Sequence, residues 1–302
     1  MSDFLGAHPD IFMARKEMHL FGSDLHFGKH FYRRNREAYL QEFDDWKDQS
    51  LGGESSVWYL ISRFAATEIH DFNPDARIII MLREPVEMMH SMHSQFLLDN
   101  NEHVSSFAKA LAAENERRRG KGLNRRCYFA QGLVYADIVR YVAQVQRYFE
   151  VFGRDRVHVI LYDDFATDVA EAYRSTLNFL GVDAAGIQPD FKVINGNKGI
   201  RCNALQAIVR DPLILSAALA VRPLVPRRVF NLLQKIDARF RRSNSRAEKR
   251  RPLDSCLRAR LEREFAPEVD RLSELLGRDL SHWSKDNSPV IKQAQMPAPV
   301  SP

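Results

Sequence analysis

Two short apolar segments are the clearest pattern along the chain. Ile78 to Leu82 is an unbroken apolar run without alternation, which predicts a strand that is buried on both faces, as in a parallel sheet. Arg156 to Tyr162 predicts a second buried strand. Arg83 directly follows the first run, and Pro85 then suits the first turn of a helix because its φ angle is fixed.

Apolar residues recur at helical spacing in the segments around these runs. The segment from Leu133 to Phe149 is predicted to be one long helix, and the helix after the second run is predicted to begin at an N-cap Thr167 and to end at Gly181. Further helices are predicted over Val57 to His70, Phe107 to Arg119, Leu205 to about Val221, Arg227 to Arg239 and Leu257 to Leu276. Strands that alternate with helices predict a three-layer α/β domain.

Composition narrows the class of protein. The 302 residues suffice for one large domain or two small ones, and the net charge of +5 favours anionic ligands without establishing nucleic-acid binding. The odd number of widely spaced cysteines, 3, fits neither a disulfide framework nor a metal site, so free thiols in a reducing compartment are expected. Met1 to Asp10 has no apolar core of a signal peptide, and the most apolar run, Leu213 to Val221, is too short to span a bilayer. A soluble, cytoplasmic protein is therefore predicted.

Arg83 is the first candidate for binding chemistry. In open α/β sheets, ligands bind at the carboxyl ends of the strands, and the planar guanidinium can bind phosphate oxygens in pairs. Ser91, about two helical turns further on, can add a hydroxyl donor. The alternative is that Arg83 forms only a structural ion pair with a carboxylate such as Glu87. The residues alone leave both interpretations open.

Several stretches, in this order, resemble the sulfotransferase family that uses 3′-phosphoadenosine-5′-phosphosulfate (PAPS), in particular its bacterial and heparan-sulfate-type, glycan-modifying members. The resemblance covers most of the chain, from about His8 to Trp283. The stretches are HPDIF, KEMHLFGSDL, GESSVWYL, RIIIMLREPVEMMHSMHSQF, VILYDDF, TLNFLGV and REFAPEVDRLSELLGRDLSHW. Each is weak alone, and their ordered set is fairly specific.

The resemblance implies a fold and an organisation. It implies a P-loop-NTPase-like parallel sheet flanked by helices, with a sulfotransferase domain over residues 1–285 and a disordered tail over 286–302. The family begins with a strand and a Gly-rich phosphate loop, and this sequence starts inside the helix that follows that loop. The expected fold therefore lacks the first strand and the phosphate loop, and the expected activity of this chain is impaired.

The resemblance also implies roles for single residues. Arg83 and Ser91 would bind the 3′-phosphate of PAPS, the co-substrate. Glu17 would be the catalytic base, with Lys16 beside it on the acceptor or the sulfonate. His19 is the second choice of base. The alternative for Glu17 is a surface pair with Lys16.

Two further sets of residues complete these expectations. Lys198 and Arg201 lie in a Gly- and Asn-rich loop that would close over the nucleotide. His90 and His93 have a spacing that a metal could use, but hydrogen-bonded or solvated histidines are expected, and no metal is predicted.

The expected function is transfer of a sulfuryl group to a hydroxyl or amine of a glycan, lipid or small metabolite. The acceptor and the oligomeric state cannot be read from the residues, and no nucleic-acid partner is expected. One alternative is a non-catalytic nucleotide- or polyanion-binding remnant that uses the clusters Arg117 to Arg126 and Arg241 to Arg251. Another is a P-loop kinase relative, although a Walker-type segment and a Mg²⁺-binding carboxylate pair are missing from the sequence.

Overall fold

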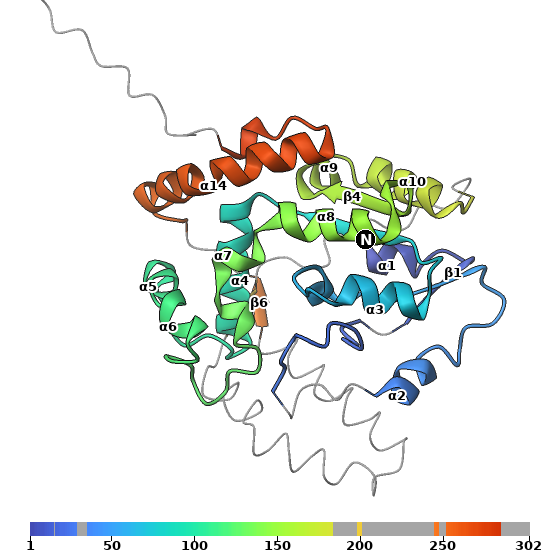
Figure 1. The fold of residues 1–302 in the computed structure, drawn as a ribbon, viewed down its shortest axis with the longest axis horizontal. Coiled ribbons are helices and arrows are strands. Elements are labelled where there is room, and N and C mark those ends of the chain that lie inside the picture. Colours follow the sequence, from blue (N-terminus) through green and yellow to red (C-terminus); the bar gives the residue numbers. More distant parts are fainter. Residues whose placement is uncertain (15, 29–34, 184–197, 201–244, 248–251, 285–302) are drawn as a thin grey trace, which may run out of the picture. The chain divides into compact units, whose positions relative to one another are not determined.

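The computed structural model describes the chain except residues 15, 29–34, 184–197, 201–244, 248–251 and 285–302 (Figure 1). The chain divides into two units, Met1–Pro252 and Leu253–Pro302. The domain boundary expected at residue 285 stays a prediction. The helices expected from Leu205 and from Arg227 lie outside the described residues, as does the expected disordered tail.

The described strands of the first unit pair two by two. Strand β1 (Ile11–Met13) is parallel to β2 (Leu51–Gly53), and β3 (Ile78–Leu82) is parallel to β4 (Val157–Leu161). Strands β5 (Lys198–Ile200) and β6 (Ser245–Ala247) form an antiparallel pair. Parallel strands connected through helices confirm the predicted α/β class.

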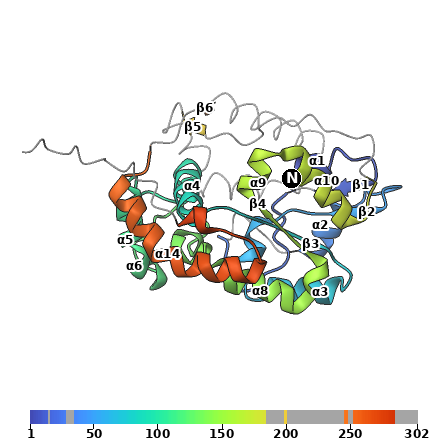
Figure 2. The same ribbon diagram turned by 90° about the horizontal axis from the view of Figure 1, so that it is seen from above.

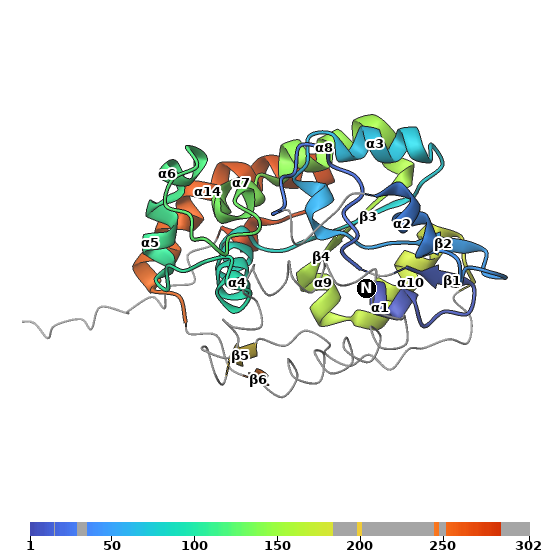
Figure 3. The ribbon, with the colours of Figure 1, turned by 90° about the horizontal axis from the view of Figure 1, so that it is seen from below.

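Helices cover both faces of the parallel strands (Figures 2 and 3). One side carries α1 (Ser2–Leu5), α9 (Tyr162–Thr167) and α10 (Val169–Leu180). The other side carries α3 (Ala65–Phe72) and α8 (Tyr141–Phe152). The predicted three-layer arrangement is therefore present in the described part of the first unit.

One core cluster, which we call the α10 cluster, contacts both parallel strand pairs. Tyr173 and Leu177 of α10 are buried there together with Ile11 of β1. Leu51 of β2 and Ile79 of β3 pack against the same cluster. One helix face thus holds both pairs, although the described strands of the two pairs are not hydrogen-bonded to each other.

The remaining described helices of the first unit are short except α4. They are α2 (Arg36–Gln41), η1 (Val57–Leu60), α4 (Pro85–Leu98), α5 (Phe107–Ala112), α6 (Glu114–Arg118), η2 (Gln131–Leu133), α7 (Tyr135–Ile138) and η3 (Arg154–Arg156). In the second unit, α14 (Ser255–Leu276) ends at Gly277 in a left-handed conformation with φ 63°, and η5 (Ser281–Trp283) packs against it. The helix expected from Leu257 to Leu276 is confirmed.

The prediction that β3 is buried on both faces is only partly right. Ile80 and Leu82 are buried, but 36% of Met81 is exposed. Alternate residues of a strand point to opposite faces, so Met81 shares its face with Ile79. Ile79 packs against the α10 cluster, whereas Met81 is not part of that cluster.

The prediction of one long helix from Leu133 to Phe149 is wrong. Helix α7 ends at Ile138, and Arg140 has ψ 61°, which is not helical. The side-chain amide of Gln144 donates to the carbonyl oxygens of Asp137 and Ile138, at 2.9 and 3.2 Å. The spacing of apolar residues is the same on both sides of this break, so it does not reveal the break.

Two smaller expectations also fail. Asp168, not Thr167, caps α10, because its carboxylate accepts from the Glu171 N–H at 2.9 Å. The segment Val57 to His70 is not one helix, since the 3₁₀ turn η1 ends before α3 begins. The end of α10 at Gly181 is confirmed, with φ 70° in the left-handed region.

Among the described residues, no helix combines the length and the apolar character needed to cross a bilayer.

The α10 cluster generates a stability prediction. The Leu177 side chain is fully buried in it, so Leu177→Ala should lower the free energy of unfolding by about 2–5 kcal/mol, measured by urea denaturation. Leu40, which is 46% exposed, provides a matched control, and Leu40→Ala should change the free energy by less than about 0.5 kcal/mol. Equal losses in the two variants would contradict this account of the core.

Candidate active site

The loop after β1 is fastened to the loop after β2. The Ala14 N–H donates to the Gly53 carbonyl at 2.8 Å, and the Glu17 N–H donates to the Ser55 carbonyl at 2.8 Å. The two segments thus stay hydrogen-bonded to each other past the ends of β1 and β2. Glu17 and Glu54 consequently belong to neighbouring loops at the same edge of the β1–β2 pair.

Glu17 and His19, two of the predicted catalytic residues, are in direct contact. Oε2 of Glu17 lies 2.8 Å from Nε2 of His19, whose side chain is fully buried. Glu17 keeps 36% of its side chain exposed and also accepts from the Val57 N–H at 3.4 Å. Lys16 does not pair with Glu17, since its Nζ lies 2.5 Å from Asp3.

Both members of this contact have a strained backbone. Glu17 has φ 62° and His19 has φ 46°, in the left-handed region that residues other than glycine rarely adopt. Such conformations cost on the order of 1–3 kcal/mol each, and they persist only where the surroundings enforce them. The chain therefore holds these two side chains together against a local preference.

The rest of this loop is held by carboxylates. Glu68 of α3 accepts from the N–H groups of Gly22 and Ser23, at 2.6 and 3.1 Å. Asp24 accepts from the Ser62 hydroxyl and from the Arg63 N–H, at 2.5 and 2.9 Å. Because three backbone N–H groups and a hydroxyl are bound in this way, the loop has little freedom to move.

Aromatic rings enclose the His19 imidazole. Phe27 stacks on it with ring centroids 4.8 Å apart, and Tyr59 meets it edge-on at 6.0 Å. Phe27 in turn stacks on Phe129 at 4.6 Å. These contacts shield His19 from water, so its polar contact with Glu17 acts in a low-dielectric environment.

Glu54 brings a second carboxylate close to this pair. Burial raises the pKa of the Glu54 carboxyl, and the negative charge of Glu17 acts in the same direction. Hydrogen bonds from Tyr59 and Ser56 and the charge of His19 offset this only in part. Glu54 therefore holds a proton more readily than a solvated glutamate does.

Arg83 lies where the sequence places it, directly after β3. Its guanidinium stacks over the ring of Tyr162, 4.8 Å from the centroid, and Tyr162 directly follows the paired strand β4. Its Nη2 also lies 3.2 Å from Oε2 of Glu87, so the ion pair of the alternative interpretation is formed. Both partners are partly exposed, and pairs of this kind contribute little, so an incoming anion can compete with Glu87 for Arg83.

The other predicted nucleotide-binding residues are placed only in part. Ser91 is half-buried on α4, the helix that begins two residues after Arg83. Lys198 belongs to β5, which contacts α4, rather than to a loop. Arg201 lies outside the described residues. The structure thus brings Glu17 and His19 together. Arg83 lies just before α4, and Ser91 lies within it.

Glu54, Ser56 and Tyr162 are site neighbours that the sequence analysis did not select. Glu54 and Ser56 follow β2, and Glu17 follows its partner β1. In the same way, Tyr162 follows β4, and Arg83 follows its partner β3. The same rule that pointed to Arg83 could have pointed to them, had the pairing of β1 with β2 been known.

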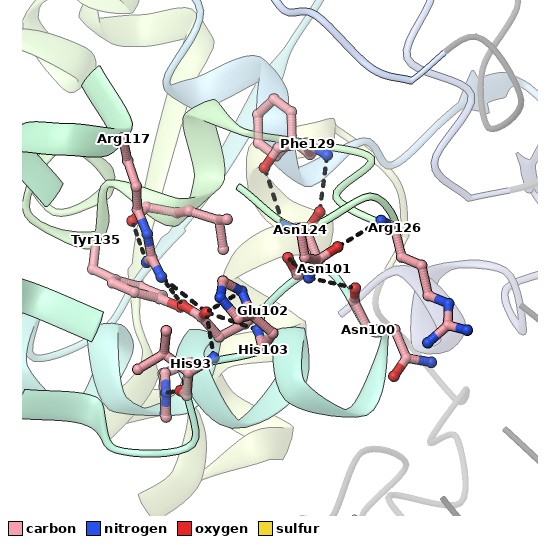
Figure 4. A network of polar contacts seen from close by, with 12 residues as sticks. His93, Asn100, Asn101, Glu102, His103, Arg117, Asn124, Arg126, Phe129 and Tyr135 are labelled. Carbon is pink, nitrogen blue, oxygen red and sulfur yellow. Dashed lines mark hydrogen bonds and ion pairs between the residues drawn. The ribbon is translucent and has the colours of Figure 1, made fainter. Parts of the chain in front are cut away.

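The first three arginines of the cluster from Arg117 to Arg126 are paired with carboxylates. Figure 4 shows Arg117 inside a network in which Glu102 accepts from Arg117 at 2.8 Å and from the Tyr135 hydroxyl at 2.9 Å. The side chains of both charged residues are fully buried. Arg118 lies 2.8 Å from Asp137, and Arg119 lies 3.0 Å from Glu116. The first part of the cluster is thus partnered by carboxylates.

Glu102 is ionised in this network. Burial raises the pKa of its carboxyl, but hydrogen bonds from the Val104 N–H and the Tyr135 hydroxyl and the charge of Arg117 outweigh it, so the pKa is lowered overall. The stabilisation from Glu102 is therefore present at neutral pH and is lost as the pH falls through its lowered pKa.

His90 and His93 of α4 contact protein groups. His93 is buried, its Nε2 lies 2.8 Å from the Val104 carbonyl, and burial lowers the pKa of its imidazole. His90 packs against the ring of Phe107 at 5.3 Å. In the described part of the chain, no group of three or more His, Cys, Asp or Glu residues could hold a metal ion.

Comparisons with known proteins agree on one family. Residues 63–194 match the family model described as sulfotransferase domain, and this range includes Arg83 and Ser91. The chain is 30% identical over 95 residues to heparan sulfate glucosamine 3-O-sulfotransferase 6 of Homo sapiens, a match that covers 32% of this chain and 26% of that protein. The chain thus spans about a quarter of the length of that curated relative.

A solved structure is similar over nearly the whole length. The crystal structure of a sulfotransferase from Alicyclobacillus acidocaldarius superposes with a TM-score of 0.67 and 28% sequence identity. The similarity covers 94% of this chain and 93% of the other.

The Glu102–Arg117 pair generates a second stability prediction. Arg117→Met leaves the Glu102 charge buried without its cation, so it should lower the free energy of unfolding by about 3–5 kcal/mol, measured by urea denaturation. Arg119→Met, which removes an exposed partner of Glu116, should cost less than about 1 kcal/mol. Similar losses would show that the Arg117 pair does not stabilise the fold.

Proposed function

The chain contains a sulfotransferase domain, and on this premise we propose that it transfers a sulfuryl group from PAPS to a hydroxyl or amine acceptor. The observation that carries the proposal is the contact between Glu17 and the buried imidazole of His19, held on a strained backbone. A strained carboxylate–imidazole pair is typical of catalytic groups rather than of surface ion pairs.

Glu17 is the base in this proposal. As the acceptor oxygen or nitrogen bonds to sulfur, the bond from sulfur to the nucleotide oxygen breaks, and the acceptor proton moves to the Glu17 carboxylate. 3′-Phosphoadenosine-5′-phosphate leaves. Glu17 suits this role because its side chain is still 36% exposed and can reach a bound acceptor. The His19 imidazole orients the carboxylate from the buried side.

Arg83 and Ser91 bind the 3′-phosphate of the donor in this proposal. Stacking on Tyr162 fixes the plane of the Arg83 guanidinium, which favours paired hydrogen bonds to phosphate oxygens. Lys198 and Arg201 are proposed to contact the nucleotide as well, and the contact of β5 with α4 supports this for Lys198. Lys16 is proposed to contact the acceptor or the sulfonate.

The acceptor class is proposed from the relative rather than from the site. The matched human protein is named for a sugar of heparan sulfate, so a glycan hydroxyl is the first acceptor to test, followed by small metabolites and lipids. Among the described residues, Cys127 and Cys256 form no disulfide, which supports a reducing compartment such as the cytoplasm. No nucleic-acid partner is proposed.

The donor site yields a binding prediction. The chain should bind 3′-phosphoadenosine-5′-phosphate more tightly than ATP in calorimetric titrations, and Arg83→Ala should weaken that binding roughly 10- to 100-fold, as expected for a charged hydrogen-bonding group. Arg174→Ala, which removes an exposed partner of Glu171, should leave the affinity unchanged. A preference for ATP with Mg²⁺ would favour the kinase alternative.

The base yields a kinetic prediction. Glu17→Gln should lower kcat by roughly 10²- to 10⁴-fold, because it removes the group that accepts the proton, while the affinity for the donor nucleotide should stay the same. Transfer of labelled sulfate from PAPS to a panel of glycans and small hydroxyl compounds measures kcat. Full activity in this variant would exclude Glu17 as the base.

A further inference from the structure

The Ser56 hydroxyl links Glu54 to the backbone of His19. It donates to Oε2 of Glu54 at 2.8 Å, and its oxygen accepts from the His19 N–H at 3.1 Å. A hydroxyl has a single proton, so a hydroxyl that donates to Glu54 turns a lone pair toward the His19 amide. The carboxylate of Glu54 thereby sets the direction in which Ser56 can bind His19.

The bond from Ser56 falls where the backbone needs support. His19 has φ 46°, and Glu17, two residues earlier, has φ 62°. The Glu17 N–H is bound to the Ser55 carbonyl, so two successive links join the strained segment to the loop after β2. Loss of the Ser56 bond would let His19 relax and would move its imidazole away from Glu17.

The surroundings of Glu54 do not suit a purely stabilising role. Burial raises the pKa of its carboxyl, and the hydrogen bonds from Tyr59 and Ser56 offset this only in part, so an ionised Glu54 is costly at this position. Tyr59 is bonded to Glu54, and Tyr39 and Tyr148 from other elements are near enough for its charge to act on them. The charge of His19 lowers the pKa of Glu54, and the charge of Glu17 raises it.

We propose that Glu54, acting through the Ser56 hydroxyl, is a positioning residue that holds the His19 backbone and thereby the contact between His19 and Glu17. This inference rests on the proposed function, because the contact that it maintains is the one assigned to the proton transfer.

The experiment compares Glu54→Gln, Ser56→Ala and Ser56→Thr with the unchanged full chain. Glu116→Gln is the matched control, because it removes a carboxylate that pairs with Arg119 on the surface. Two sets of measurements are made for each protein. One is the hydrogen exchange of the His19 amide, and the other is kcat together with KM for PAPS.

The inference predicts a distinct result for each variant. Ser56→Ala should speed exchange of the His19 amide and lower kcat, each by roughly tenfold, as one lost hydrogen bond implies, with KM for PAPS unchanged. Ser56→Thr keeps the hydroxyl and should restore both. Glu54→Gln should also speed exchange of the His19 amide and lower kcat, because a neutral amide holds the Ser56 hydroxyl less tightly than a carboxylate does.

The double variant Glu54→Gln/Ser56→Ala should lose no more kcat than Ser56→Ala alone, because Glu54 acts through Ser56. Additive losses would overturn the inference. So would unchanged His19 exchange in both single variants, whatever their activity. If the unchanged chain transfers no sulfate but Ser56→Ala still speeds His19 exchange, the proposed function fails and the positioning by Ser56 stands.

Discussion

Parallel strand pairing is the constraint on which the site depends. Two parallel neighbours end at the same edge, so the residues that follow them are brought together without any further element. After β1 and β2, this places Glu17 and His19 against Glu54 and Ser56. After β3 and β4, it places the Arg83 guanidinium over the Tyr162 ring. The cluster under α10 then holds the two pairs in one core.

The polar groups around Glu102 and those around Glu17 differ in how well their surroundings stabilise them. In the Glu102–Arg117 network, the carboxylate receives several hydrogen bonds and its pKa is lowered, so it is ionised and stabilises the fold. In the loop after β1, the backbone is strained, and burial raises the pKa of the neighbouring Glu54. Unfavourable features of this second kind are retained where geometry serves a reaction rather than stability.

Apolar runs and turn residues predicted much of the fold, because strands and helix ends have local signals. The strand Ile78–Leu82, its partner Val157–Leu161 and the ends of α10 and α14 at Gly181 and Gly277 all follow from neighbouring residues. The break at Arg140 and the burial of Arg117 do not, since each depends on partners distant in the sequence or on backbone angles that composition does not reveal. For the same reason, neither the contact of Glu17 with His19 nor the link from Glu54 through Ser56 was predicted from the sequence.

The central claim is that the edge after β3 binds the 3′-phosphate of a sulfuryl donor while the loop after β1 supplies the base. A crystal structure of the full chain with 3′-phosphoadenosine-5′-phosphate tests this most directly. The account predicts the 3′-phosphate on the Arg83 guanidinium and the Ser91 hydroxyl, with the 5′-phosphate directed toward Glu17. A nucleotide bound elsewhere, or bound with its 5′-phosphate directed away from Glu17, would contradict the account.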